Sequence, residues 1–228
     1  MSGFHQFLFG IYPYIALAIF LLGSLVRFDR EQYTWKSDSS EMLRRGQLRW
    51  GSNLFHLGIL MLFGGHFVGL LTPKEVYHAI GLSTQGKQIV AIAAGGFAGT
   101  LCLIGIALLL HRRHTVRANP RTMDFVILYW ILITLLIGLV SIVASLSHLD
   151  GGVMVALSHW AQHLVTFRGD AASFIVNVPL IYKIHLFFGM TLFILFPFSR
   201  LVHVWSGFAS VAYVIRPYQI VRRRGAAR

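Results

Sequence analysis

Four histidines lie inside two stretches of the sequence that are otherwise apolar. His56 and His66 lie in the stretch 51–72, and His185 and His203 lie in the stretch 180–203. Ionisable side chains at membrane depth are costly, and they usually face the interior of a helix bundle in a functional role. Imidazole is also a common axial ligand of haem iron. Two histidines from each of two helices therefore predict two ligand pairs for two haems, and a proton relay through the same side chains is the alternative.

The direction of the two helices decides which histidines face one another. If the chain begins outside the membrane, the earlier helix runs outward and the later helix runs back inward. His66 then faces His185 near the outer side, and His56 faces His203 near the inner side. In straight helices the first two histidines are separated by ~15 Å and the last two by ~27 Å. Straight parallel helices cannot satisfy both pairs, so we expect Pro197 to kink the later helix.

The composition indicates a protein surrounded by lipid. The chain has 228 residues, a mean hydropathy of +0.66 and 12% charged residues, whereas soluble domains carry about 25%. Five apolar runs are each long enough for the ~20 residues of a spanning helix. They occupy residues 7–27, 51–72, 88–110, 125–147 and 180–203. The expected fold is all-α, a single domain over residues 1–228 that forms a five-helix transmembrane bundle.

The net charge of +12 is distributed unevenly along the chain. With the N-terminus outside, sixteen of the 20 lysines and arginines lie on the inner side, and only Lys74, Lys87, Arg168 and Lys183 lie on the outer side. This asymmetry predicts a periplasmic N-terminus and a cytoplasmic C-terminus. It favours anionic lipid or an acidic protein partner over nucleic acid. The start of the chain lacks the basic segment of a cleavable signal.

Several other polar residues are weaker candidates for binding. Arg112 and Arg200 fall at the inner rim, where they could pair with haem propionates, although the residues alone favour anchoring at the membrane surface. His159 and His163 lie four residues apart in the segment 153–167, which we expect to form a short interfacial helix. Such a pair can bind a metal ion, but no third ligand is apparent nearby.

Three long stretches carry a family resemblance. They are IYPYIALAIFLLGSLVRFDREQYTWKSDSSEML, SNLFHLGILMLFGGHFVGLLTP and IHLFFGMTLFILFPFSRLVHVWS. Together they resemble the γ subunit of membrane-bound respiratory nitrate reductase. The resemblance covers almost the whole chain and is loosest over residues 73–86 and 148–179.

The resemblance implies a five-helix cytochrome b of the cell inner membrane that contains two haem b groups. It implies that His66 and His185 hold the distal haem, and that His56 and His203 hold the proximal haem. Such a subunit oxidises quinol and passes electrons to an iron–sulfur β subunit. The electrons then reach a molybdenum-containing α subunit, where nitrate is reduced to nitrite.

The resemblance also implies a quinol pocket beside the distal haem. A lysine just before the third helix matches Lys87, and it would act together with Gly65 and His66 on menaquinol or ubiquinol. From the residues alone, Lys87 is more typical of a lysine that extends to the membrane surface. The region that precedes Lys87 departs from the family pattern, which leaves the wall of the pocket undefined.

Two other functions are compatible with the same pattern. One is a related quinone cytochrome b in a complex of the heterodisulfide or sulfite reductase type. The other is a haem-free membrane protein that conducts protons through its histidines. Co-purification of a molybdenum subunit would distinguish a nitrate reductase subunit from the related quinone cytochrome. An absorption spectrum would distinguish any cytochrome from the haem-free proton conductor. The inner connections 28–50, 111–124 and 207–228 are the expected docking surface for partner subunits.

Overall fold

A computed structural model of the chain describes residues 2–31, 45–115 and 122–205, in which every regular element is helical. Four helical segments within these ranges are long and apolar enough to cross a membrane. They are Gly3–Arg30, Arg45–Leu71 (α3), Thr84–Thr115 (α5) and Thr122–Ser145 (α6). These segments correspond to the first four apolar runs of the sequence, and each extends beyond the predicted limits on at least one side.

The first segment is a continuous helix with a wider turn near its start. It consists of α1 (Gly3–Gln6), a π-helical turn (Phe7–Ile11, η1) and α2 (Tyr12–Glu31). Pro13 has no N–H, so the carbonyl of Phe9, four residues earlier, lacks its usual donor from the next turn. The indole of Trp160 donates to that carbonyl over 2.8 Å. A neighbouring helix thus compensates for the proline, as is common in membrane proteins.

The predicted fifth helix, 180–203, was wrong in its inner limit. The helix α8 covers Leu180–Leu195 only and is followed by a turn and a short 3-10 helix, Arg200–Val202 (η4). Pro197 has no backbone N–H, so the helical hydrogen-bond pattern cannot continue through it, and it directly follows Phe196, the C-cap of α8. The expected kink at Pro197 is therefore a break, and α8 is shorter than the four spanning segments.

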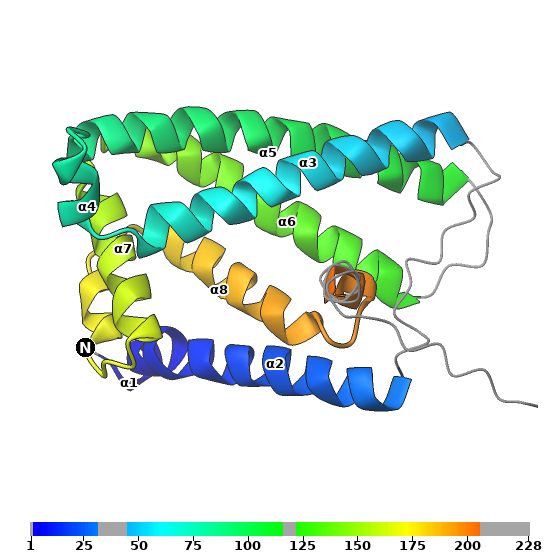
Figure 1. Cartoon of the computed structure of the whole chain (residues 1–228), viewed down its shortest axis with the longest axis horizontal. Helices are drawn as coiled ribbons and strands as arrows, with labels where there is room; N and C mark the ends of the chain where they lie inside the picture. Colours follow the sequence, from blue (N-terminus) through cyan, green and yellow to red (C-terminus); the bar gives the residue numbers. More distant parts are fainter. Residues whose placement is uncertain (1, 32–44, 116–121, 206–228) are drawn as a thin grey trace, which may run out of the picture.

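Three short helices gather at the end of the bundle that holds the N-terminus (Figure 1). They are α4 (Lys74–Ala79), α7 (Gly152–Val165) and the 3-10 helix η3 (Ala171–Ile175). The predicted interfacial helix 153–167 corresponds to α7. It packs on η3 and α3, and its apolar face joins the first turns of the chain in one of two core clusters. We refer to this side as the N-terminal end of the bundle.

The long helices pack in a chain of pairs. The helix α3 lies on α5, α5 packs on α6, α6 packs on α8, and α8 packs on α2 (Figure 1). The contact between α3 and α5 is very close, because a Cβ built on Gly58 would lie 2.5 Å from the backbone nitrogen of Cys102. Glycine permits this approach between backbones. The helix that carries His56 and His66 is therefore fixed firmly to its neighbour.

Candidate functional site

Two pairs of histidine rings connect α3 with the segment that contains α8 and η4. The centroids of the His66 and His185 rings lie 6.0 Å apart, with their planes inclined by 36°. The centroids of the His56 and His203 rings also lie 6.0 Å apart, with an angle of 75° between the planes. These are the two facing pairs that the helix directions predict. Two imidazole nitrogens each about 2 Å from one metal ion, on opposite sides, give centroids roughly 6 Å apart.

Three of the four rings are held by the same type of hydrogen bond. In each, Nδ1 lies within hydrogen-bonding distance of a backbone carbonyl oxygen. The contacts join His56 to Ser52 (2.7 Å), His66 to Leu62 (2.7 Å) and His203 to Arg200 (2.6 Å). Because a carbonyl oxygen only accepts, Nδ1 carries the proton and Nε2 keeps its lone pair. This tautomer is the one that suits a metal ligand, and the carbonyl fixes the ring orientation.

The fourth ring, that of His185, is packed against α6. Its Nδ1 is buried and makes no hydrogen bond within the usual distance and angle limits to the described residues. The backbone of Thr134 nevertheless interacts with this imidazole. A Cβ built on Gly138 would lie 2.9 Å from Cε1 of the ring. The absence of a side chain at Gly138 is therefore what allows α6 to lie so close to this imidazole.

The break after α8 is held by a side chain from α2. Nη1 of Arg27 donates to the carbonyl oxygens of Pro197 (2.7 Å) and Ser199 (2.9 Å). The hydroxyl of Ser199 accepts a hydrogen bond from the backbone N–H of Leu201 over 3.2 Å. These contacts fix the path of the chain just before it reaches His203.

A group of charged residues lies at the same end of the bundle as His203. Nη2 of Arg113 lies 2.6 Å from Oδ2 of Asp124, and Nε of Arg200 lies 3.8 Å from Oδ1 of the same carboxylate. Arg112 is buried in the last turn of α5. Arg200 thus shares the carboxylate of Asp124, which lies in the first turn of α6.

Lys87 is folded into the protein at the N-terminal end. Only 9% of the residue is exposed, its Nζ lies 4.2 Å from the centroid of the Tyr77 ring, and the Thr72 carbonyl oxygen is 3.5 Å away. Thr72 directly follows the helix that carries Gly65 and His66, so the ammonium lies against the end of that helix. A Cβ built on Gly65 would meet no atom within 4 Å, which leaves this face of α3 open beside His66.

The side chains of His159 and His163 contact residues of η3 and its N-cap. Nδ1 of His163 lies 2.7 Å from Oδ1 of Asp170, and both imidazole rings pack on Phe174. The hydrogen bond from His163 holds the pKa of the Asp170 carboxyl below its usual range. No group of three or more potential metal ligands was found among the described residues, so these contacts favour a role in joining α7 to η3.

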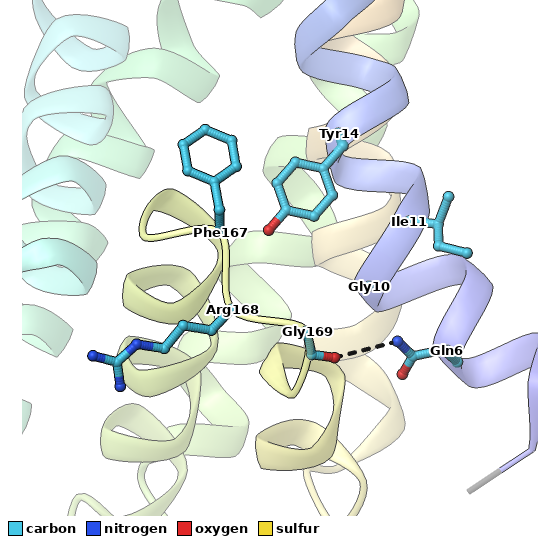
Figure 2. Close-up of a pocket in the computed structure, with 7 residues that line it drawn as sticks. All are labelled: Gln6, Gly10, Ile11, Tyr14, Phe167, Arg168 and Gly169. Atoms are coloured by element: carbon cyan, nitrogen blue, oxygen red, sulfur yellow. Dashed lines mark hydrogen bonds between the residues drawn. The ribbon is translucent and has the colours of Figure 1, made fainter.

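A shallow pocket of about 380 Å³ opens at the N-terminal end, between the first helix and the turn after α7 (Figure 2). Its lining residues are Gln6, Gly10, Ile11, Tyr14, Phe167, Arg168 and Gly169. The rings of Tyr14 and Phe167 stack at 5.9 Å, and the backbone of Phe167 is left-handed, with φ of 58°. None of the histidine pairs or Lys87 lines this pocket, so it is separate from the candidate site.

Sequence reasoning missed three residues that support the histidines. Arg27 is one of the sixteen basic residues on the inner side, and neither Asp124 nor Gly138 was singled out. The pairing of Asp124 with arginines is the kind of contact that opposite charges at neighbouring helix ends suggest. Nothing in the local sequence distinguishes Gly138 from the other glycines of the apolar runs.

Comparisons with known proteins give matches over almost the whole chain. The family model described as nitrate reductase gamma subunit matches residues 5–224. The respiratory nitrate reductase 1 gamma chain of Escherichia coli (strain K12) is 49% identical over 227 residues, which cover 98% of this chain and all of that protein. The respiratory nitrate reductase 2 gamma chain of the same organism is 49% identical over 222 residues, 96% of each chain. The nitrate reductase gamma chain of Bacillus subtilis (strain 168) is 37% identical over 227 residues, 98% of this chain and all of that one.

Proposed function

The chain belongs to the nitrate reductase gamma subunit family, and we propose that it is the membrane subunit that carries electrons from quinol through two haem b groups. The observation that supports this function best is the presence of two histidine pairs with the same 6.0 Å separation. A single imidazole pair has several explanations, but two pairs contributed by the same two chain segments are what the axial ligands of two haems require.

The four paired histidines have the side-chain chemistry that two haem b groups require. His66 and His185 would hold the distal haem, and His56 and His203 the proximal haem. Carbonyl oxygens fix the tautomer of three of these rings, so that Nε2 faces the ligand side. When bound, haem supplies one-electron chemistry whose potential depends on its axial ligands and surroundings.

Two arginines remain candidates for the haem propionates. Arg112 is buried, and Arg200 lies three residues before the ligand His203. Nε of Arg200 lies 3.8 Å from the Asp124 carboxylate, which places its guanidinium at the same end of the bundle as His203. Guanidinium groups bind carboxylates with two parallel hydrogen bonds.

Quinol would bind at the N-terminal end, beside the distal pair. The buried ammonium of Lys87 can donate a hydrogen bond to a quinol oxygen, and such charge-assisted bonds are strong where water is excluded. The open face at Gly65 gives a flat ring access to the surface of α3 next to His66. The substrate is a membrane quinol, either menaquinol or ubiquinol, and its two protons leave on the periplasmic side.

We propose a topology of five spans in the cytoplasmic membrane, with the N-terminus periplasmic and the C-terminus cytoplasmic. Four spans are the long helices, and the fifth is the broken segment that begins with α8. Broken helices occur at membrane depth where protein surrounds them. The iron–sulfur β subunit and the molybdenum-containing α subunit would dock on the basic cytoplasmic face. Much of that face, residues 32–44, 116–121 and 206–228, lies outside the described part of the chain.

A spectrum and a haem count test the proposal directly. The complex is purified from membranes, and a reduced-minus-oxidised spectrum is recorded together with the number of haems per gamma chain. We expect b-type bands and two haems. The His66→Ala variant is expected to lose one haem and quinol oxidation. A colourless subunit, or a His66→Ala variant with full quinol oxidation, would contradict the assignment and favour a haem-free role for the histidines.

A further inference from the structure

The two ligand-bearing segments differ in the number of residues between their histidines. His56 and His66 are ten residues apart on the unbroken helix α3, whereas His185 and His203 are eighteen apart. Unbroken helices would separate them by ~15 Å and ~27 Å. Both pairs nevertheless meet at 6.0 Å. The segment after α8 must therefore abandon the helical rise, and it does so between residues 195 and 200.

This break creates a problem of hydrogen bonding. The last carbonyls of a helix have no donor within the helix, and unsatisfied carbonyls at membrane depth are costly. The Arg27 guanidinium supplies donors to two carbonyls of the break, those of Pro197 and Ser199. The Ser199 hydroxyl donates to the carbonyl of Phe196 over 3.1 Å. One side chain of a different helix thus satisfies two backbone carbonyls of the break.

The helix that carries Arg27 is also fitted closely to the break. A Cβ built on Gly23, one turn before Arg27, would lie 2.8 Å from Cγ of Pro197. From Ser199 the chain continues to Arg200, whose carbonyl oxygen accepts the hydrogen bond from Nδ1 of His203 over 2.6 Å. Only residues 200–202 therefore separate the turn that Arg27 holds from His203, and the hydrogen bond from His203 to Arg200 spans them.

We propose that Arg27 is a positioning residue for the proximal ligand. It acts through the backbone of residues 197–200, because its guanidinium holds the carbonyls of Pro197 and Ser199 in the broken conformation. This inference rests on the proposed function, because His203 is a ligand only if a haem lies between it and His56. The competing explanation is that Arg27 is simply one of the many basic residues at the inner membrane surface.

Arg30 provides a matched control for that explanation. It lies on α2 three residues after Arg27, is exposed, and carries the same charge at the same end of the helix. A role that depends only on charge predicts equal effects for Arg27→Gln and Arg30→Gln. A role in positioning predicts an effect of Arg27→Gln alone.

The experiment uses the whole complex in membranes. The haem-to-chain ratio and the paramagnetic resonance signals of both oxidised haems are measured for Arg27→Gln, Arg30→Gln and the reference variant His203→Ala. The signal that is missing in His203→Ala identifies the proximal haem, and the remaining signal reports on the distal haem. We expect Arg27→Gln to shift or lose the proximal signal, with the ratio falling from two toward one, while the distal signal and Arg30→Gln stay unchanged.

Three outcomes would overturn this inference. They are an unchanged proximal signal in Arg27→Gln, an equal loss of both haems in that variant, and the same change in Arg30→Gln. Retention of two haems by His203→Ala would instead contradict the proposed function itself. The two failures are therefore distinguishable in one set of samples.

Discussion

Gly138 of α6 lies directly against the imidazole of His185 in α8, and a Cβ at this glycine would come within 2.9 Å of Cε1 of the ring. Atoms that close cannot both keep their positions, and closely packed interiors transmit such a displacement to their neighbours. The choice of residue on one helix therefore controls the position of a candidate ligand on another.

Replacement of Gly138 by alanine is expected to displace the His185 ring and to shift or abolish the distal haem signal, while the proximal signal stays. Gly96→Ala is the control, because a Cβ there meets no atom within 4 Å. Both variants are compared by redox titration and paramagnetic resonance of membranes. An unaltered distal signal in Gly138→Ala would show that the ring adapts without leaving its ligand position.

Replacement of Lys87 by alanine removes the ammonium that we assign to quinol binding. A hydrogen bond to a charged group contributes about 1.5–3 kcal/mol, so kcat/KM for quinol should fall by roughly tenfold to a hundredfold. Lys74 is an exposed lysine at the same end of the bundle, and Lys74→Ala should leave kcat/KM for quinol unchanged. Steady-state quinol oxidation measures both, and equal behaviour of the two variants would remove Lys87 from the pocket.

Tyr77 places an aromatic face under the Lys87 ammonium at 4.2 Å, and both residues are buried. A desolvated cation–π contact contributes up to about 2 kcal/mol. Tyr77→Leu should therefore raise the KM for quinol by about tenfold with a smaller effect on kcat, and Tyr77→Phe should preserve both. If Tyr77→Phe is as impaired as Tyr77→Leu, the hydroxyl rather than the ring face is what matters.

The two histidine pairs differ in the angle between their ring planes, 75° for the pair of His56 and His203 and 36° for the pair of His66 and His185. Axial imidazole planes that approach a right angle bring two iron d orbitals closer in energy and spread the g values. The proximal haem is therefore expected to show the more anisotropic low-spin signal. Spectra of oxidised wild type and of His203→Ala would assign the signals, and the reverse order would contradict the prediction.

The Asp170 carboxyl should contribute to stability in a pH-dependent way. Its pKa is lowered in the folded protein, chiefly by the hydrogen bond from His163. The folded form thus binds the proton less readily, so the stabilisation is present above about pH 4 and disappears as the pH falls through the lowered pKa. Asp170→Asn should reduce the thermal unfolding temperature at neutral pH but not at acid pH. Asp150→Asn, at an exposed residue of the preceding loop, is the control.

Much of this arrangement could be predicted from the sequence because its determinants are local. Apolar runs of sufficient length identified the first four spanning helices, and the alternating direction of consecutive spans paired His66 with His185 and His56 with His203. The long match to the gamma subunit family gave the family, which the comparisons confirmed. The predicted roles of the histidines and of Lys87 remain proposals.

The parts that could not be predicted depend on contacts between distant segments. Pro197 indicates a distortion, but whether the helix bends or stops depends on donors elsewhere, and here Arg27 lies 170 positions earlier in the chain. The proximity of Gly138 to His185 likewise arises from the packing of α6 on α8. Lys87 resembled a surface anchor because its burial depends on Tyr77 and the turn after α3.

The close seating of α3 on α5 has a consequence for the speed of electron transfer. One ligand of each proposed haem lies on this single unbroken helix, and its backbone is pressed onto that of α5 at Gly58. The packed helices α3 and α5 therefore set the distance between the two proposed haems. This distance matters because the rate of electron tunnelling decays exponentially with it. Changes in bilayer thickness or lateral tension should leave the rate between the centres almost untouched.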